Sequence, residues 1–289
     1  MTLSSDSTPI WQHLLFPNIA SEDVLVAIRN ALENNGYSSY DPFPGGIGSP
    51  IGKQTRIRAF AAPPSEGWQS IFFAPNDGVA ASILTDFAMS INSPFLDLRL
   101  YSLEDYQITV YDVDTATTNL SSLLPFLKLG LNMSDLESAQ YEPSPSASES
   151  TSPPNLPPEL QQFADKKGVQ SKHVDKLMGR MTKRIFKKME QRSGDSSDST
   201  QEQAKAMLSG QVQDALNSSA GQKLRSIISC LTVPDDWDLP DWKTLVAAYP
   251  IARQLQKGDA LLLPGDEAAL KEVPNALEFT PLYYAKRTT

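Results

Sequence analysis

Two stretches in the first part of the chain, 21–36 and 76–94, place apolar residues at the spacing of an amphipathic helix. In the first stretch, Ser21 is positioned to cap the helix and Gly36 to end it. In the second, Asp77 or the Asn before it would provide the cap. The inward-facing stripe expected for the first helix consists of Val24, Leu25, Ile28 and Leu32.

Four short segments are rich in strand-forming residues, and apolar and polar residues alternate along the last two. These segments are 55–62, 68–74, 95–101 and 106–113. Turn-forming residues join them in pairs, which predicts two hairpins. Along FLDLRLY the three leucines are expected to face a core, with Asp97 and Arg99 facing solvent. The order of elements predicts an α+β fold, with an N-terminal antiparallel sheet and helices on one of its faces.

The last third of the chain, 201–289, is expected to be mainly helical. Its longest helix should follow Asp238 as the cap, and DEAALKE (266–272) should form a shorter one. Trp237 and Trp242 are interpreted as core anchors in preference to a partner-facing patch. The final apolar run, EFTPLYYAKR, should pack as a strand or an extended arm. The core stripe expected for the longest helix consists of Leu245, Val246, Tyr249 and Leu255.

Two low-complexity stretches divide the chain. Residues 141–158 are rich in Pro and Ser and indicate a linker, and 193–200 indicate a second flexible break. The pattern therefore predicts an α+β domain over 1–140, a basic helical hairpin over 159–192, and the C-terminal region.

Charge is distributed unevenly along a chain whose net charge is −9. Residues 161–192 hold ten Lys and Arg against three acidic residues, whereas 1–160 hold six basic and eighteen acidic residues. The acidic part disfavours binding to nucleic acid, so a polyanion would have to meet the basic segment. The single cysteine, Cys230, excludes an internal disulfide and predicts a reducing, cytoplasmic location. We expect no secretory signal and no membrane-spanning helix.

Motifs that would carry catalysis or bind a cofactor are not formed. The glycine cluster at 44–54 departs from the phosphate-loop spacing and precedes a strand, where no helix N-terminus can hold an anion. The two histidines, His13 and His173, are about 160 residues apart in a chain with one cysteine. A zinc site of Cys and His ligands cannot be assembled from them, and no local signature marks a catalytic triad. We therefore predict no catalytic residue, no metal and no cofactor.

The basic segment carries the one motif with a specific functional interpretation. Ala164, Gly168 and the apolar residues after them are spaced in a way that resembles a helix-turn-helix, over about 20 residues. The resemblance implies a second helix in a major groove, with Lys172, His173, Lys176 and Arg180 as candidate nucleic-acid or anion contacts. A longer apolar stripe on the same helix instead favours a seam with a partner helix. That seam would consist of Val174, Leu177, Met178, Met181, Ile185 and Met189.

These observations favour a non-enzymatic protein–protein interaction or regulatory protein with a protein partner. The length of the apolar stripe and its adaptable methionines support this hypothesis. One alternative is a DNA- or RNA-binding regulator that uses 160–192, and another is an enzyme whose site is assembled from dispersed residues. Self-association into a homo-oligomer, and docking of the basic segment on the acidic N-terminal domain, are also open.

Overall fold

A strand that the hydrophobic pattern does not reveal, β1 (Trp11–Pro17), lies at the centre of the sheet. It pairs antiparallel with β4 (Trp68–Phe73) on one side and with β5 (Phe95–Leu100) on the other. Because both of its faces are buried, WQHLLFP shows none of the alternation that marks a half-exposed strand. The computed structural model describes residues 8–141 and 215–287, except 44–45, 47, 49–53, 114, 239, 259–261 and 263–264.

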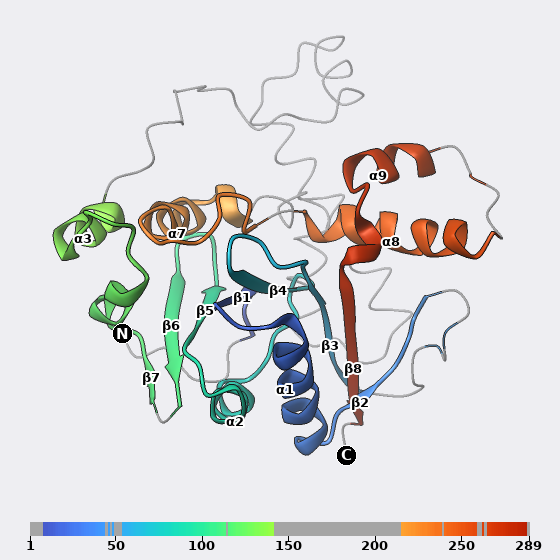
Figure 1. The fold of residues 1–289 in the computed structure, drawn as a ribbon, viewed down its shortest axis with the longest axis horizontal. Helices are drawn as coiled ribbons and strands as arrows, with labels where there is room; N and C mark the ends of the chain where they lie inside the picture. Colours follow the sequence, from blue (N-terminus) through green and yellow to red (C-terminus); the bar gives the residue numbers. More distant parts are fainter. Residues whose placement is uncertain are drawn as a thin grey trace, which may run out of the picture. The chain divides into compact units, whose positions relative to one another are not determined.

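Eight antiparallel strands form one sheet in the order β2-β8-β3-β4-β1-β5-β6-β7 (Figure 1). The remaining strands are β2 (Ser38–Ser39), β3 (Gln54–Ala61), β6 (Tyr106–Asp112), β7 (Thr115–Thr117) and β8 (Thr280–Arg287). The helices of the N-terminal part are α1 (Ser21–Asn34), α2 (Ala81–Ile91), η1 (Leu120–Phe126) and α3 (Met133–Tyr141). Those of the C-terminal part are α7 (Ser219–Ser229), α8 (Trp242–Lys257), α9 (Asp266–Glu272) and η3 (Ala276–Glu278).

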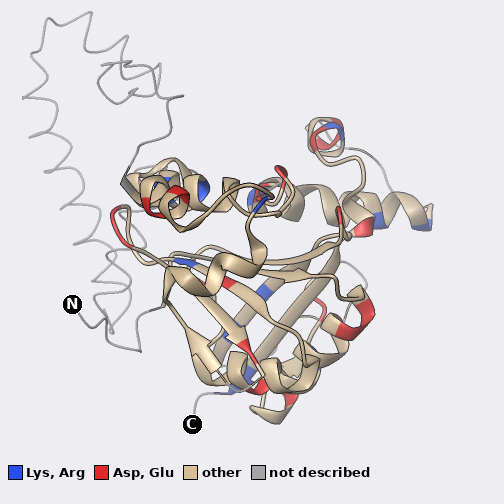
Figure 2. Cartoon of the chain, turned by 60° about the vertical axis from the view of Figure 1, so that its left-hand side comes forward, with Lys and Arg blue, Asp and Glu red and all other residues tan. Residues whose placement is uncertain are grey.

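Helices cover both faces of the sheet, as the layers in Figure 2 show. On one face, α1 and α2 pack on alternate residues of the strands, including Leu14 and Phe16. On the opposite face, η1, α3 and α7 cover Leu15 and the leucines of β5. The buried residues of these helices and strands form one hydrophobic core, together with Trp68 and Trp237, and we call this core the α7 cluster. Beside it, α8, α9 and η3 cover Phe60 and Phe72, which we call the α8 cluster. Residues 14, 15 and 16 therefore point alternately into different cores, as strand geometry requires.

The α+β prediction is confirmed. Both expected hairpins form, β3–β4 and β5–β6, and the two expected N-terminal helices lie on the same face. The region after residue 214 is helical, and its final apolar run forms the expected strand, β8. That strand is inserted between β2 and β3, so the C-terminal segment completes the N-terminal sheet. The described parts of both regions, within 8–141 and 215–287, belong to one compact unit.

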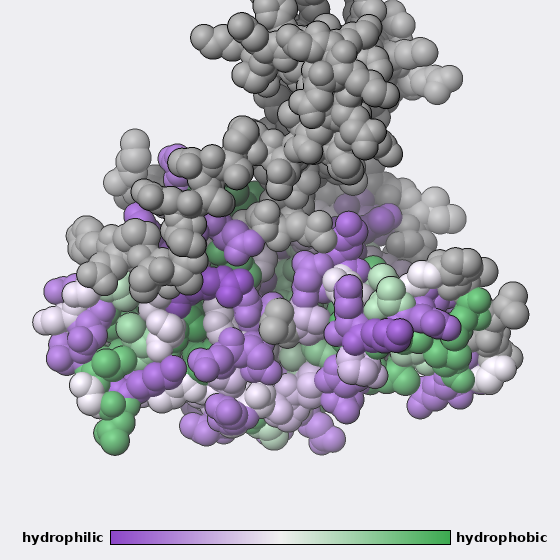
Figure 3. All heavy atoms as spheres, turned by 90° about the horizontal axis from the view of Figure 1, so that it is seen from above, coloured by the Kyte–Doolittle hydropathy of each residue, from purple (hydrophilic) through white to green (hydrophobic). Residues whose placement is uncertain are grey.

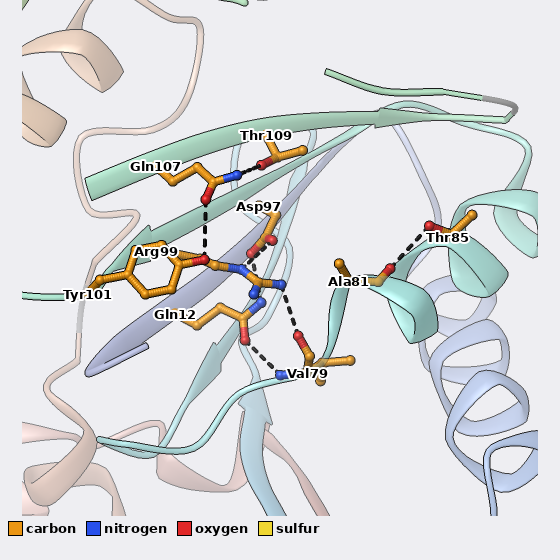
Figure 4. Close-up of polar contacts among 9 residues, drawn as sticks. All are labelled: Gln12, Val79, Ala81, Thr85, Asp97, Arg99, Tyr101, Gln107 and Thr109. Carbon is orange, nitrogen blue, oxygen red and sulfur yellow. Dashed lines mark hydrogen bonds and ion pairs between the residues drawn. The ribbon is translucent and has the colours of Figure 1, made fainter. Parts of the chain in front are cut away.

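The buried charges of β5 contradict the prediction that they face solvent. Asp97 is 1% exposed and Arg99 8% exposed, on the face of the sheet opposite to the three leucines. Arg99 Nε donates to Asp97 Oδ2 at 2.6 Å, and Gln12 Nε2 donates to Asp97 Oδ1 at 2.7 Å (Figure 4). Val79 closes the network, because its N–H donates to Gln12 and its carbonyl accepts from Arg99. The loop before α2 covers these side chains, so the polar positions of β5 are buried and paired.

The caps predicted for α1 and α2 are not formed in the structure. Ala20 and Ala80 precede α1 and α2, and neither helix has a side-chain cap. Ser21 donates to Gln69 instead. Asp77, expected to cap α2, binds Arg58 through two side-chain bonds of 2.7 and 3.1 Å.

The long C-terminal helix begins three residues later than expected. Asp241, not Asp238, is the cap of α8, and Asp238 pairs with Arg225. Leu245 is buried in the α8 cluster, and Val246 and Tyr249 pack against it, whereas Leu255 is 40% exposed. Ala248, which was not part of the predicted stripe, is buried together with Leu245.

The cap of α8 yields a first stability prediction. Asp241 Oδ2 accepts from the backbone N–H groups of Lys243 and Thr244 at 3.1 and 3.2 Å. Replacing Asp241 by Ala should lower the free energy of unfolding by about 1 kcal/mol, because two N-terminal donors lose their partner. Denaturant titration would measure this, with Asp236→Ala as the exposed, non-capping control. Equal effects of the two substitutions would refute the role of the cap.

The predictions for the middle of the chain concern residues outside the described part of the structure. These include both low-complexity linkers beyond Tyr141, the basic hairpin and the helix-turn-helix-like spacing. Helices α3 and α7, which border that part of the chain, pack against each other. Among the described residues, no helix is long and apolar enough to cross a membrane.

Candidate functional site

A groove opens on the sheet face that carries the C-terminal helices, where the α7 and α8 clusters meet. It has a volume of about 410 Å³. Its floor comes from β1 and β4, and its walls come from the β3–β4 turn, the α7–α8 connection and the segment from α9 to η3. The groove is lined by Leu15, Ala62, Pro63, Pro64, Ser65, Trp68, Ser70, Pro234, Asp236, Trp237, Pro240, Glu272, Val273, Asn275, Glu278 and Phe279.

A histidine lies beneath this floor. Leu15 of β1 pairs with Ser70 of β4, and His13, two residues earlier, lies on the same face. The His13 Nε2 atom is hydrogen-bonded to Ser70 Oγ, and Nδ1 is buried with no hydrogen-bond partner among the described residues. Three aromatic rings surround the imidazole, those of Trp11, Phe72 and Trp237, with centroids 5.4 to 5.6 Å away. The hydrogen bond to His13 therefore holds the Ser70 hydroxyl next to a cluster of aromatic rings.

Burial controls what this pair can do chemically. His13 is 2% exposed, and burial lowers its pKa from 6.5 to about 3. The imidazole is therefore neutral at physiological pH and a weak base. A serine nucleophile needs a base that can take its proton and a third group that orients this base. Here the base disfavours the proton and its second nitrogen has no described partner, so the geometry suits a structural floor better than a nucleophile.

The two lips of the groove carry carboxylates. Asp236 belongs to the α7–α8 connection, whereas Glu272 ends α9 and Glu278 ends η3. All three residues are exposed, and Asn275 Nδ2 donates to Glu278 at 3.2 Å. No Lys or Arg stands among the described lining residues. In Figure 3, which shows this side of the molecule, hydrophilic residues cover most of the described surface.

Below the carboxylates the groove is aromatic and apolar. Trp68 and Trp237 are 6% and 9% exposed, and Phe279 is 5% exposed. Both tryptophans belong to the α7 cluster and Phe279 to the α8 cluster, so their positions are set by the two cores. The expectation that Trp237 anchors the core is confirmed, and its ring also borders the groove. An apolar base with a few polar groups at the mouth is the usual composition of a binding site.

None of the site residues predicted from the sequence is among the described residues. Both sets, the candidate anion contacts and the partner-helix seam, lie within 172–189, outside the described residues. Within the part of the chain that the structure describes, no group of three His, Cys, Asp or Glu side chains could hold a metal ion.

The groove itself was not predicted. Ser70 and Trp68 sit in a predicted strand, and Trp237 was assigned to the core, but their convergence with Glu272 and Glu278 depends on pairings across more than 200 residues. The aromatic and acidic density of 235–242 was the one local signal. The interpretation as core packing is confirmed for Trp237, whereas the cap is Asp241 and not Asp238; neither interpretation revealed a groove.

Comparison with known proteins leaves the site to be judged on its own geometry. No family model, no curated protein and no solved structure matches this chain.

Proposed function

We propose that this chain is a non-enzymatic protein–protein interaction or regulatory protein, and that the groove over Ser70 is a surface on which it binds a peptide segment of its partner. The observation that carries the proposal is the construction of the groove. Its base is a set of buried rings held by two cores, and its mouth is lined with exposed side chains from three segments. Such a preformed site loses little conformational entropy when a ligand binds.

The chemistry of the floor supports binding in preference to catalysis. The His13 imidazole bonded to Ser70 is surrounded by rings and has its pKa lowered to about 3 by burial. We also propose a cytoplasmic location, because Cys230 is a free thiol. The basic segment 159–192 would serve as a second interaction element, through the methionine-rich stripe at Met178 and Met181.

Selection from a randomised peptide library on the immobilised full chain would test the groove. We expect enriched peptides whose affinity falls at least about tenfold in Asn275→Trp, because an indole at this exposed position would fill the mouth. The matched control is Asn30→Trp, on the exposed side of α1 and on the opposite face of the sheet. It should leave the affinity unchanged.

Two results would contradict the proposal. One is a set of enriched peptides that bind equally well to Asn275→Trp, or no enrichment at all. The other is covalent labelling of Ser70 by a serine-reactive fluorophosphonate, which would require an activated hydroxyl. That labelling would favour the dispersed-site enzyme.

A further inference from the structure

Resting on the proposed function, we infer that the groove selects a basic peptide segment of a partner protein, in which Lys or Arg side chains flank an apolar anchor residue. The apolar anchor would enter the aromatic base between Trp237 and Phe279. The cationic side chains would reach the carboxylates on the two lips, Asp236 on one side and Glu272 with Glu278 on the other.

Charge complementarity is the first argument. Asp236, Glu272 and Glu278 take part in no ion pair between described residues, whereas their neighbours Asp235 and Asp238 pair with Lys128 and Arg225. The lips therefore present three carboxylates that a ligand cation can approach. The same charges repel phosphate, which disfavours a nucleic acid at this surface.

The aromatic base gives the second argument. A Lys or Arg side chain is amphipathic, with an apolar stem that packs on rings and a charged head that remains near water. The rings of Trp68, Trp237 and Phe279 offer that packing surface beneath the carboxylates. Cations are also attracted to the faces of tryptophan rings. A peptide that combines apolar and cationic residues therefore matches both the aromatic base of the groove and the carboxylates on its lips.

The walls explain why recognition would run through side chains. Pro63 and Pro64 lie in one wall, and Pro234 and Pro240 in another. Proline has no backbone N–H and a fixed φ, so these walls are stiff and offer few donors to a peptide backbone. The nearby backbone groups of Ser65 and Trp68 already bond to each other. Specificity therefore falls to the carboxylates and the rings.

Fluorescence anisotropy of the selected peptides would test this assignment on the full chain. The test variant combines Asp236→Asn, Glu272→Gln and Glu278→Gln. We expect about tenfold weaker binding and a smaller dependence on salt, since exposed ion pairs are lost. The control combines Glu22→Gln, Asp23→Asn and Glu33→Gln, which change the net charge equally on exposed positions of α1. It should bind as the unmodified chain does, and peptides with Gln in place of Lys and Arg should bind weakly to both.

The outcomes separate this inference from the proposed function. The inference would be overturned if Asn275→Trp weakened peptide binding while the variant with three neutralised carboxylates bound the same peptides as the unmodified chain does. That result would preserve the proposed function. A further variant, Lys172→Gln with Lys176→Gln and Arg180→Gln, should not change the affinity. Tighter binding in that variant would identify the chain's own basic segment as the occupant, and would overturn the assignment to a partner.

Discussion

Replacing Asp97 by Ala should lower the free energy of unfolding by about 3–5 kcal/mol, although the position was predicted to face solvent. The substitution leaves the Arg99 guanidinium buried without its carboxylate, and it removes the acceptor of Gln12 Nε2. Both partners also hold Val79, the residue before the cap of α2. The damage should therefore extend to the loop at 76–80. Urea unfolding followed by tryptophan fluorescence would measure the change.

Two comparisons make this result interpretable. The double substitution Asp97→Leu with Arg99→Met should be less destabilising than Asp97→Ala alone, because no uncompensated charge stays buried. The exposed pair between Asp235 and Lys128, 3.8 Å apart, is the surface control, and Asp235→Ala should leave the unfolding midpoint unchanged. A small effect of Asp97→Ala, equal to that of the surface control, would show that the network is not a structural element.

The error at β5 shows what alternation can and cannot predict. The period of two correctly separated Leu96, Leu98 and Leu100 from Asp97 and Arg99, because successive residues of any strand point to opposite faces. The assumption that a polar face meets water does not follow from geometry. Here the loop before α2 covers the charged face, and the charges pair with Gln12 on β1.

Strand β1 was missed for a related reason. A strand buried on both faces has no alternation and reads as a short apolar run. The polar residues Gln12 and His13 made this run appear less like a core strand, yet both are buried. Each has a role that no local pattern encodes, since Gln12 bonds to Asp97 and His13 to Ser70.

Local chemistry located elements better than it located sites. Turn residues and apolar periodicity are properties of neighbouring residues, so both hairpins and the helices α1, α2, α8 and α9 could be predicted, whereas α3 and α7 were not. Helix ends were less certain, because Asp238 and Asp241 are equally suitable caps and only tertiary contacts assign Asp238 to Arg225. The groove required β8 and η3 to return to β3, a long-range pairing that one sequence does not reveal.

The second large effect is a dependence of stability on pH that comes from His13. Burial lowers its pKa from 6.5 to about 3 in the folded chain. Between these pH values the unfolded chain binds a proton at His13 that the folded chain does not. His13 therefore does not lower the free energy of unfolding well above pH 6.5, and it lowers this free energy increasingly as the pH falls. The slope is about 1.4 kcal/mol per pH unit, which gives a loss of about 2 kcal/mol between pH 7.5 and pH 5. By pH 3 this one residue would cost about 4 kcal/mol.

The substitution His13→Gln isolates this contribution, because Gln keeps a hydrogen-bonding group near Ser70 but does not titrate. Urea unfolding at a series of pH values should show a steep dependence in the unmodified chain and a shallow one in the variant. The difference between the two pH profiles is the informative quantity. Burial raises the pKa of the Asp97 and Asp77 carboxyls, so these groups bind protons more readily in the folded chain and stabilise it as the pH falls, but they do so in both proteins. Parallel pH profiles of the two proteins would mean that His13 is accessible to protons in the folded state, and the floor of the groove would then have to be open to water.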